Sequence, residues 1–169
     1  MIDYIDNFFD QDVYYSIVDY CLRAPYSFGE TDNPNQPPTG MVSHFDPEHE
    51  LYTTINESIN SKISAVQKLN LYTMNINYFA PCENPYFHTD AEYGITCLYY
   101  LGPIKAMKQR WMSPKYTIDD NGETQFFVNK KSINILPIAN RMCFFDASIL
   151  HRATSFRNCY RFTIAIKYR

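Results

Sequence analysis

The sequence lacks the patterns that mark several large classes of protein. Its five cysteines are odd in number and widely spaced, and none forms a Cys-x-x-Cys pair, so neither a zinc ribbon nor a disulfide framework is expected. No stretch approaches the ~18 consecutive apolar residues of a membrane helix. Positive charge is not in excess, because the net charge is -3, so no basic field over the whole chain favours nucleic acid.

The N-terminal residues carry no targeting signal. Residues 1–10 include Asp3, Asp6 and Asp10 but no basic n-region, which argues against a signal peptide. The cysteines are interpreted as reduced thiols; they are Cys21, Cys82, Cys97, Cys143 and Cys159. A cytoplasmic location without a membrane partner is therefore expected.

The chain contains enough apolar material for one compact domain. It has 169 residues, of which 46% are hydrophobic and 17% aromatic, including 15 Tyr and 12 Phe. Aromatic rings fit the pleated, half-buried surface of a sheet, so this composition favours strands. We expect a single domain over 1–169, in which 1–70 supplies helical support and a proline-rich loop and 71–168 forms the β core.

Two helices are predicted in the first part of the chain. Asp10 is placed as the N-cap of the first helix, which ends before Pro25. Its apolar face consists of Val13, Tyr14, Ile17, Val18 and Cys21. The second helix is predicted over Thr53–Leu69, from apolar residues at helical spacing. Between the helices, Pro25–Pro47 holds five of the ten prolines and is interpreted as a long loop, either a lid over a site or a surface excursion.

The remainder of the chain has the character of strands. β-Branched and aromatic runs separated by turn residues predict strands at Leu71–Phe79, Gly94–Leu101, Glu123–Asn129, Ser132–Ile138, Arg141–Asp146, His151–Phe156 and Arg161–Lys167. Pro103–Gly122 is predicted to be a polar excursion. The order of elements favours a mainly β fold with N-terminal helices (α+β), in the form of a β-sandwich or jelly roll backed by two helices.

One of the four histidines lies in the segment Phe87-His88-Thr89-Asp90. In an extended segment, residues two apart point to the same side, so His88 and Asp90 can reach one metal ion together. His151, at the start of a predicted strand, is the candidate for a third ligand. Two imidazoles and one carboxylate on one face leave three positions open, which suits Fe(II). A lone His-x-Asp triplet is weak evidence, because most strand histidines are hydrogen-bonded core or surface residues.

Other residues would suit an oxo-acid bound beside such a metal. Arg161 lies ten residues after His151 in a strongly apolar strand, where an unpaired guanidinium is costly. The carboxylate of 2-oxoglutarate would satisfy its planar fork, and so would a protein acid. Tyr78 lies ten residues before His88, and Tyr100 follows in the next predicted strand, so phenol hydroxyls are available as further donors.

Together these residues resemble the prolyl-4-hydroxylase-type branch of the Fe(II)/2-oxoglutarate oxygenases over Leu71–Lys167. The resemblance rests on the order and spacing of Tyr78, His88-x-Asp90, the run Thr96-Cys97-Leu98-Tyr99-Tyr100-Leu101, Gly122-Glu123-Thr124, His151 and Arg161. The run is similar to that of the oxygen-sensing prolyl hydroxylases of animals. The size is similar to small stand-alone forms from bacteria and phages, and a phage-encoded chain would act in the host cytoplasm.

The resemblance implies a double-stranded β-helix with Fe(II) at its open end, held by His88, Asp90 and His151. It implies that Arg161 binds the distal carboxylate of 2-oxoglutarate, with Tyr100 as second donor. The other residues that it places around the co-substrate are Tyr78, Met74, Leu98, Ala153 and Ala165. Dioxygen is the second co-substrate, and ascorbate is a candidate reductant.

The reaction implied is hydroxylation of a C–H bond, in the first instance in a prolyl residue of a peptide or protein, with release of succinate and CO₂. A small-molecule substrate is the second option. Two departures from the family pattern occur: Asn121-Gly122 replaces a glycine pair, and Lys167 replaces an aromatic residue six positions after Arg161. The second departure predicts a different pocket wall.

Two other functions remain open at this stage. Nucleic-acid dealkylation by the same chemistry is suggested by Asn75-x-Asn77-Tyr78 and by a loop in which Trp111 is surrounded by Lys105, Lys108, Arg110 and Lys115. The net charge of -3 and the short segment between His151 and Arg161 argue against nucleic acid. The other alternative is a non-catalytic metal-binding jelly-roll interaction domain, in which Arg161 faces a protein acid.

Overall fold

The computed structural model describes residues 1–28, 31, 33, 35–107, 110–112 and 115–169, with the side chains of all of these outside 106–114. The helices are α1 (Gln11–Arg23), α2 (Glu50–Lys62) and the 3-10 helices η1 (Ser64–Val66) and η2 (Ile118–Asp120). The strands are β1 (Ile2–Ile5), β2 (Met41–His44), β3 (Leu71–Phe79), β4 (Ile95–Met107), β5 (Arg110–Met112), β6 (Thr124–Val128), β7 (Lys131–Ile135), β8 (Arg141–Asp146), β9 (His151–Ala153) and β10 (Tyr160–Tyr168). This confirms the predicted mainly β fold with N-terminal helices.

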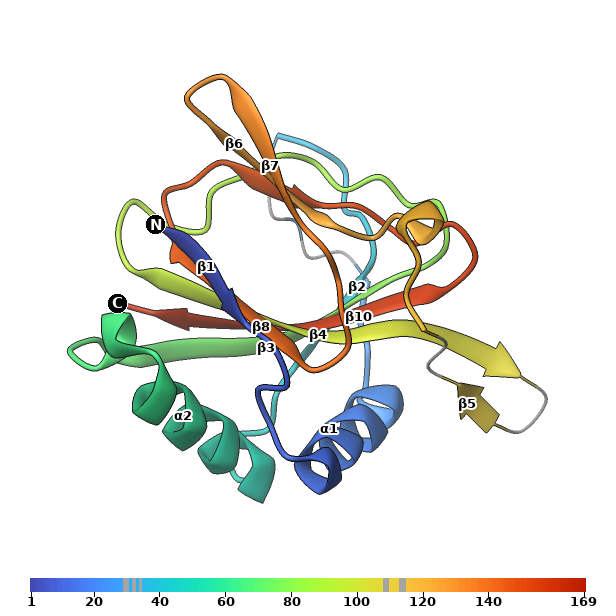
Figure 1. Ribbon diagram of the computed structural model, residues 1–169, viewed down its shortest axis with the longest axis horizontal. Coiled ribbons are helices and arrows are strands. Elements are labelled where there is room, and N and C mark those ends of the chain that lie inside the picture. The colour runs from blue at the N-terminus through green and yellow to red at the C-terminus, as the bar shows by residue number, and fades with distance from the viewer. Residues whose placement is uncertain (29–30, 32, 34, 108–109, 113–114) are drawn as a thin grey trace.

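The strands form two antiparallel sheets. The larger sheet has seven strands in the order β1-β8-β4-β10-β3-β2, with β5 paired to β4, and the smaller has the order β7-β6-β9. Figure 1 shows α1 and α2 on one side of the larger sheet and the β6–β7 hairpin on the other. The larger sheet is therefore the middle layer, and its two faces meet different surroundings. Within the described part of the chain, no helix is long and apolar enough to cross a bilayer.

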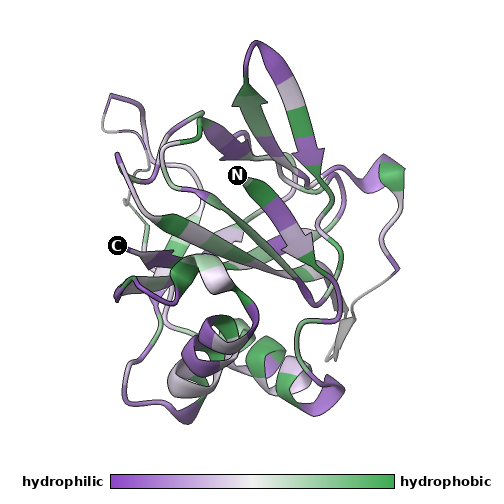
Figure 2. Ribbon diagram, turned by 60° about the vertical axis from the view of Figure 1, so that its left-hand side comes forward, coloured by the Kyte–Doolittle hydropathy of each residue, from purple (hydrophilic) through white to green (hydrophobic). Residues whose placement is uncertain are grey.

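The main apolar core lies between the larger sheet and the helices. Tyr14, Ile17 and Cys21 of α1 are buried there together with Leu51, Ile55 and Ile59 of α2. Figure 2 shows hydrophobic and hydrophilic residues side by side on both helices, as expected for helices with one buried face. A smaller cluster lies on the other face of the larger sheet and includes Leu98, Tyr100, Phe126, Phe145 and Ala165. The candidate site adjoins this second cluster.

The predicted helix boundaries were right for the first helix and partly wrong for the second. Asp10 stands at the N-cap of α1, although its side chain makes no capping hydrogen bond. The second helix begins at Glu50 and ends at Lys62, not over Thr53–Leu69. At Ile63 the backbone leaves the helical region, and the next turn is η1. The apolar spacing continued across this break because Ile63, Val66 and Leu69 all pack in or against the core, so periodicity alone did not reveal it.

Tertiary pairing produced strands that local sequence did not predict. β4 was expected to end at Leu101, but it continues to Met107, because Pro103 and Ile104 lie opposite Arg161 and Tyr160 of β10. The start of the predicted polar excursion is therefore part of the sheet. β1 was also missed, and it exists as an edge strand paired with β8. In the basic loop, the side chains of Arg110 and Trp111 lie outside the described side chains, and Lys108 lies outside the described residues.

A paired charge ties the N-terminal segment to β8 and leads to a first prediction. Arg141, which is 7% exposed, donates from Nε to Asp6 Oδ1 (2.6 Å) and from a terminal nitrogen to Oδ2 (2.9 Å). The hydrogen bond from Arg141 is the main reason why the pKa of Asp6 is below its ordinary value. Asp6→Asn is expected to lower stability at pH 7 by about 1 kcal/mol, or about 2–4 °C in the melting midpoint.

The pH dependence of that loss follows from the depressed pKa of Asp6. A carboxyl with a depressed folded pKa contributes stability that is present above its unfolded pKa of about 3.9 and lost as pH falls through the folded value. The melting midpoints of wild type and Asp6→Asn should therefore converge below about pH 4. Glu57→Gln, at an exposed carboxylate on α2, is the control. A gap that persists unchanged at pH 3 would contradict the assignment.

Candidate active site

A cavity lies between the two sheets, against a face of β10 that is polar although the strand is central. The residues of β10 that line it are Arg161, Thr163, Ala165 and Lys167. The alternate residues Phe162, Ile164 and Ile166 belong to the core on the helix side. The other lining residues are Asn77, Phe79, His88, Asp90, Thr96, Leu98, Thr124, Phe145, His151 and Ala153. Alternation along one strand thus separates the apolar core from a polar cavity.

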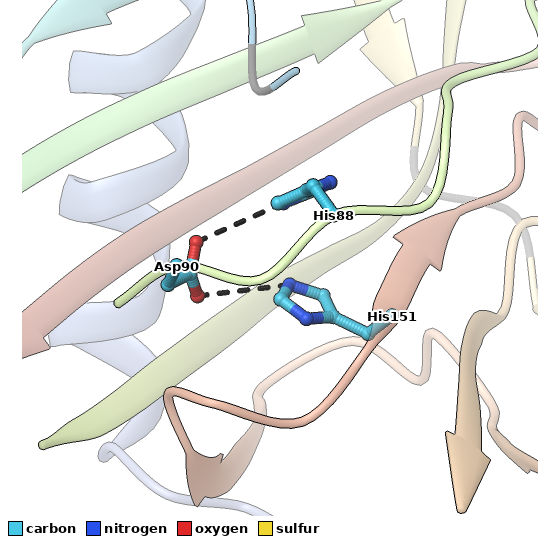
Figure 3. Close-up of side chains that lie close together, drawn as sticks. All are labelled: His88, Asp90 and His151. Carbon is cyan, nitrogen blue, oxygen red and sulfur yellow. Dashed lines mark ion pairs between the residues drawn. The ribbon is translucent and has the colours of Figure 1, made fainter. Parts of the chain in front are cut away.

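Two histidines and one aspartate come together at this cavity, as Figure 3 shows. His88 and Asp90 lie between β3 and β4, and His151 begins β9. The distance from His88 Nε2 to Asp90 Oδ1 is 3.7 Å, and that from His151 Nε2 to Asp90 Oδ2 is 3.6 Å. One ligand atom from each of the three residues lies within 4.8 Å of the others. This spacing suits three ligands of a single metal ion.

Backbone pairing holds the two histidines in register. The amides of His88 and His151 each donate to the carbonyl of the other at 2.9 Å, and the amide of Asp90 donates to the carbonyl of Ala147 at 2.9 Å. The 80–94 segment is thereby attached to the start of β9. The sequence predicted His151 only as a candidate from the order of residues, whereas this bridge places it beside His88.

Each imidazole has its Nδ1 next to a backbone carbonyl. His88 Nδ1 lies 3.1 Å from Tyr86 O, and His151 Nδ1 lies 2.9 Å from Ile149 O. Donation from Nδ1 to these carbonyls fixes the tautomer that leaves the Nε2 lone pair available. Both Nε2 atoms face Asp90. The donor set of two neutral imidazoles and one carboxylate therefore fits a transition-metal ion such as Fe(II).

The Asp90 carboxylate is almost completely buried, with 3% of its side chain exposed. Thr96 donates from Oγ1 to Oδ2 at 2.6 Å, and the Lys167 ammonium lies 2.7 Å from Oδ1. Burial acts to raise the pKa of Asp90, but the charges of His151 and Lys167 outweigh it and hold this pKa below its ordinary value. Asp90 is thus kept ionised, and a lysine stands directly beside the candidate metal position.

His151 lies in apolar surroundings that favour its neutral form. Burial is the largest effect and lowers the pKa of His151, although the nearby Asp90 acts in the opposite direction. Its ring lies 4.6 Å from the ring of Phe145 and 5.8 Å from that of Phe126, measured between centroids. A neutral imidazole is the form that binds a metal, so these surroundings favour ligation.

Arg161 is buried without a carboxylate partner among the described residues. It is 1% exposed, and its hydrogen bonds go to neutral groups. Nε donates to Gly122 O at 2.9 Å, and a terminal nitrogen donates to Thr124 Oγ1 at 3.0 Å. Burial lowers the pKa of Arg161 to about 10. The protein acid that the non-catalytic alternative requires does not pair with Arg161 in the described part of the chain, so this charge is available to an anionic ligand.

Gly122 positions the carbonyl that holds Arg161. Its φ is +89°, and a Cβ built on it would lie 2.3 Å from the ring of Phe156. Only glycine fits both this conformation and this space. Gly122 therefore positions the carbonyl that binds the guanidinium. From the sequence, Gly122 was interpreted only as part of a turn that departs from the family pattern.

Tyr100 lies beside Arg161, with its ring centroid 5.7 Å from the guanidinium carbon. Its hydroxyl donates to Thr124 Oγ1 at 2.6 Å. The phenol proton is therefore engaged with Thr124 in this structure, and donation from Tyr100 to a co-substrate stays a prediction. Leu98, Ala153 and Ala165 lie in the cavity wall, and their contact with a co-substrate likewise stays a prediction.

The predicted positions of Tyr78 and Met74 near the co-substrate were wrong. Both side chains pack in the core on the helix side, where the Tyr78 ring stacks on Tyr160 at 5.7 Å. The residues of β3 that line the cavity are instead Asn77 and Phe79. The error is one of parity, because a shift by one residue in a strand moves a side chain to the opposite face. Spacing to His88 could not settle this, since 80–87 is not extended throughout.

Comparisons with known proteins were made for both sequence and fold. No protein family model and no curated protein matches the sequence. Among solved structures, a prolyl-4-hydroxylase from Pseudomonas putida has a TM-score of 0.71 at 13% identity, covering 99% of this chain and 91% of that one. A prolyl hydroxylase from Trichoplax adhaerens, in complex with a hypoxia inducible factor peptide fragment, has a TM-score of 0.72 at 15% identity, covering 99% and 82%.

A third similar structure is HygX from Streptomyces hygroscopicus with nickel, 2-oxoglutarate and hygromycin B bound. Its TM-score is 0.72 at 10% identity, covering 99% of this chain and 82% of that one. The chain has the fold of the 2-oxoglutarate/Fe(II) oxygenases. The suspected resemblance is thereby confirmed at the level of the fold, and this oxygenase fold carries His88, Asp90 and His151 as a group that can hold a metal.

Proposed function

We propose that the protein is an Fe(II)- and 2-oxoglutarate-dependent dioxygenase that hydroxylates a C–H bond, in the first instance in a prolyl residue of a peptide or protein. The observation that carries the proposal is Arg161, a buried guanidinium without a carboxylate partner among the described residues, in the same cavity as the three candidate metal ligands. A buried cation of this kind is costly unless an anion joins it. A dicarboxylic oxo-acid bound to a metal at the other end would supply one.

In this proposal His88, Asp90 and His151 hold Fe(II), and Arg161 binds the distal carboxylate of 2-oxoglutarate. The bound metal and co-substrate supply oxidative decarboxylation with dioxygen, which yields succinate and CO₂ and oxidises the substrate. The chain's own residues orient these groups. Thr124 and Gly122 hold the guanidinium in place, and the apolar side chains of Phe79 and Leu98 exclude water from the cavity.

The proposal treats 1–169 as one domain whose sheets form a double-stranded β-helix. Its support is that the two antiparallel sheets face each other across the cavity, with the candidate ligands on the smaller sheet and on the 80–94 loop. Residues 1–70 supply the helices that cover the outer face of the larger sheet, together with β1 and β2. Residues 1–70 thus pack against the larger sheet, so a separate apolar core for them is not required.

A prolyl peptide is favoured as substrate because two of the structures described above are prolyl hydroxylases, one of them in complex with a peptide. A small molecule remains the second candidate, since HygX has the same fold and is seen with hygromycin B. Nucleic-acid dealkylation finds no added support in the described part of the cavity, because the aromatic side chains that line it are limited to Phe79, Phe145 and the histidines.

The test is substrate-dependent formation of succinate from 2-oxoglutarate, with Fe(II), dioxygen and ascorbate present. Prolyl peptides, hygromycin B and N-methylated oligonucleotides form the three arms, and product mass identifies an added oxygen atom. Wild type should respond to prolyl peptides, and Asp90→Asn should not. Succinate formation with the oligonucleotides alone would mean that the reaction is dealkylation of nucleic acid and not prolyl hydroxylation. Failure of 2-oxoglutarate to stabilise metal-loaded protein would overturn the oxygenase proposal altogether.

A further inference from the structure

A second cavity adjoins the first on the side of β2. The two cavities share Asn77, Phe79, Ala165 and Lys167, so they have a common wall. Lys167 stands at this wall with 20% of its side chain exposed, and its ammonium reaches Asp90 in the first cavity. Lys167 therefore borders both cavities.

The segment before β2 packs closely against β3 at the wall of the second cavity. Gly40, with φ +72°, passes so close to β3 that a Cβ on it would lie 2.5 Å from Tyr78 O and 2.6 Å from the Phe79 ring. Its amide donates to Glu83 Oε1 at 3.2 Å. The segment before β2 is thereby attached to the loop that also carries His88. The second cavity therefore has a defined position relative to the candidate metal site.

The described lining of the second cavity offers hydrogen-bond donors and no acid. Thr39 contributes a hydroxyl, and Asn75 and Asn77 contribute amides. Lys167 also borders this cavity, although its ammonium lies at Asp90 in this structure. The other described lining residues are Gly40, Met41, Val42, Phe79 and Ala165. A cavity with several donors, a lysine at its border and no carboxylate suits an anionic group with an apolar part beside it.

The charge of the loaded site leads to the same conclusion. The ionisable residues that line the two cavities, among those described, are His88, Asp90, His151, Arg161 and Lys167. With neutral imidazoles they comprise one carboxylate and two cations. The charges of a divalent metal and a doubly negative 2-oxoglutarate cancel each other. The loaded site therefore keeps one positive charge, and a low-dielectric cavity favours its neutralisation by a bound anion.

Metal binding makes the present position of Lys167 unfavourable. Its ammonium lies 2.7 Å from Asp90 Oδ1, which is next to the place where the dication would bind. An ammonium and a divalent metal ion beside the same carboxylate repel each other strongly in a buried site. The second cavity, which Lys167 also borders, holds no second cation among its described lining residues and offers the side-chain oxygens of Thr39, Asn75 and Asn77 as acceptors for the ammonium. Arg161 lies at the opposite end of the lining face of β10.

We propose that the second cavity binds a carboxylate of the substrate, that Lys167 is the residue that binds it, and that this carboxylate lies only a few bonds from the carbon that is hydroxylated. The inference rests on the proposed function and adds a substrate class to it. A single net positive charge matches a monovalent carboxylate rather than a phosphate, which carries about -1.5 to -2. The carboxylate is either the free end of an amino acid or peptide, or the side chain of an acidic residue.

The experiment uses full-length protein kept anaerobic with saturating 2-oxoglutarate and with Mn(II) below the protein concentration, so that all of the metal is bound. Bound Mn(II) broadens the proton signals of small molecules that approach it. The probes are N-acetylproline and N-acetylprolinamide, which differ only in the carboxylate. N-acetylvaline and its amide test whether the proline ring matters, and an aspartyl-proline amide tests a side-chain source.

In wild type, each carboxylate probe should bind near Mn(II) about tenfold or more tightly than its amide partner. The same broadening of proton signals should therefore be reached at a correspondingly lower concentration of the carboxylate probe. Lys167→Met should reduce this ratio to about one, Lys167→Arg should retain most of it, and the exposed Lys131→Met should leave it unchanged. Equal broadening of acid and amide by wild type, or a preference that survives in Lys167→Met, overturns the proposal. Stabilisation of the Mn(II) protein by 2-oxoglutarate is measured in parallel, so that failure here is distinguished from failure of the oxygenase proposal.

Discussion

Replacing Arg161 with methionine is expected to abolish stabilisation by 2-oxoglutarate and, at the same time, to raise the stability of the ligand-free protein. Arg161 is 1% exposed and bonds to neutral groups, so folding must bury a charge that no described carboxylate pairs with directly. The desolvation of such a charge costs several kcal/mol, whereas a carbonyl left without a partner at Gly122 costs about 1–3 kcal/mol. The net gain in the free energy of unfolding should be about 1–2 kcal/mol.

The loss of ligand response in the same variant should be complete. At a hundredfold excess over its dissociation constant, a ligand that binds only the folded state adds about 2.7 kcal/mol, which at this size is about 5–10 °C in the melting midpoint. Thermal melts of Mn(II)-loaded protein with and without 2-oxoglutarate measure both effects. Arg23→Met, at an exposed residue of α1, is the matched control and should change neither. An Arg161→Met protein that is less stable and still responds to 2-oxoglutarate would refute the assignment.

Replacing Lys167 with methionine is expected to tighten metal binding by at least about tenfold. The ammonium stands 2.7 Å from Asp90 Oδ1 and so competes with a metal for the same carboxylate. At about 5 Å and an effective dielectric constant of about 20, a unit charge and a dication repel by about 6–7 kcal/mol. Rotation of the lysine away from the metal relieves most of this repulsion, so only a part of it appears in the affinity. A tenfold change corresponds to about 1.4 kcal/mol.

The same variant should be less stable without metal, since Asp90 then remains buried without its ammonium partner. Titration with Mn(II), followed by the loss of the free-ion EPR signal, gives the affinity, and thermal melts give the metal-free stability. Lys131→Met is the control, because this lysine is exposed on the β6–β7 hairpin. Weaker Mn(II) binding by Lys167→Met would show that the lysine orients Asp90 for the metal instead of competing with it.

Several features of this protein were determined by the sequence alone, because they depend on local spacing. The His88-x-Asp90 triplet places two ligands on one side of an extended segment wherever the segment lies. The apolar faces of the two helices and the strand at Leu71–Phe79 also follow from residues that are neighbours along the chain. The high content of aromatic residues and the order of elements were enough to predict a mainly β fold with helices at its N-terminal end.

The wrong prediction for Tyr78 shows that spacing along the chain does not determine which face of a strand a residue occupies. Which face of β3 meets the cavity depends on its pairing with β10, where Thr163 lies opposite Asn77 and Arg161 opposite Phe79. A one-residue shift exchanges the two faces, and counting back from His88 through an irregular loop does not fix that parity. β1 and the extension of β4 were missed for a related reason, since both strands exist through partners far away in the chain.

Only the tertiary structure decided the chemistry that surrounds the candidate ligands. It placed His151 beside His88 through a backbone bridge, left Arg161 among neutral groups in the described part of the chain, and directed Lys167 to Asp90. The sequence had predicted merely that the wall near Lys167 would differ from its relatives. Burial and the pairing of charges depend on which distant segments meet, and a side chain's neighbours along the chain do not contain that information.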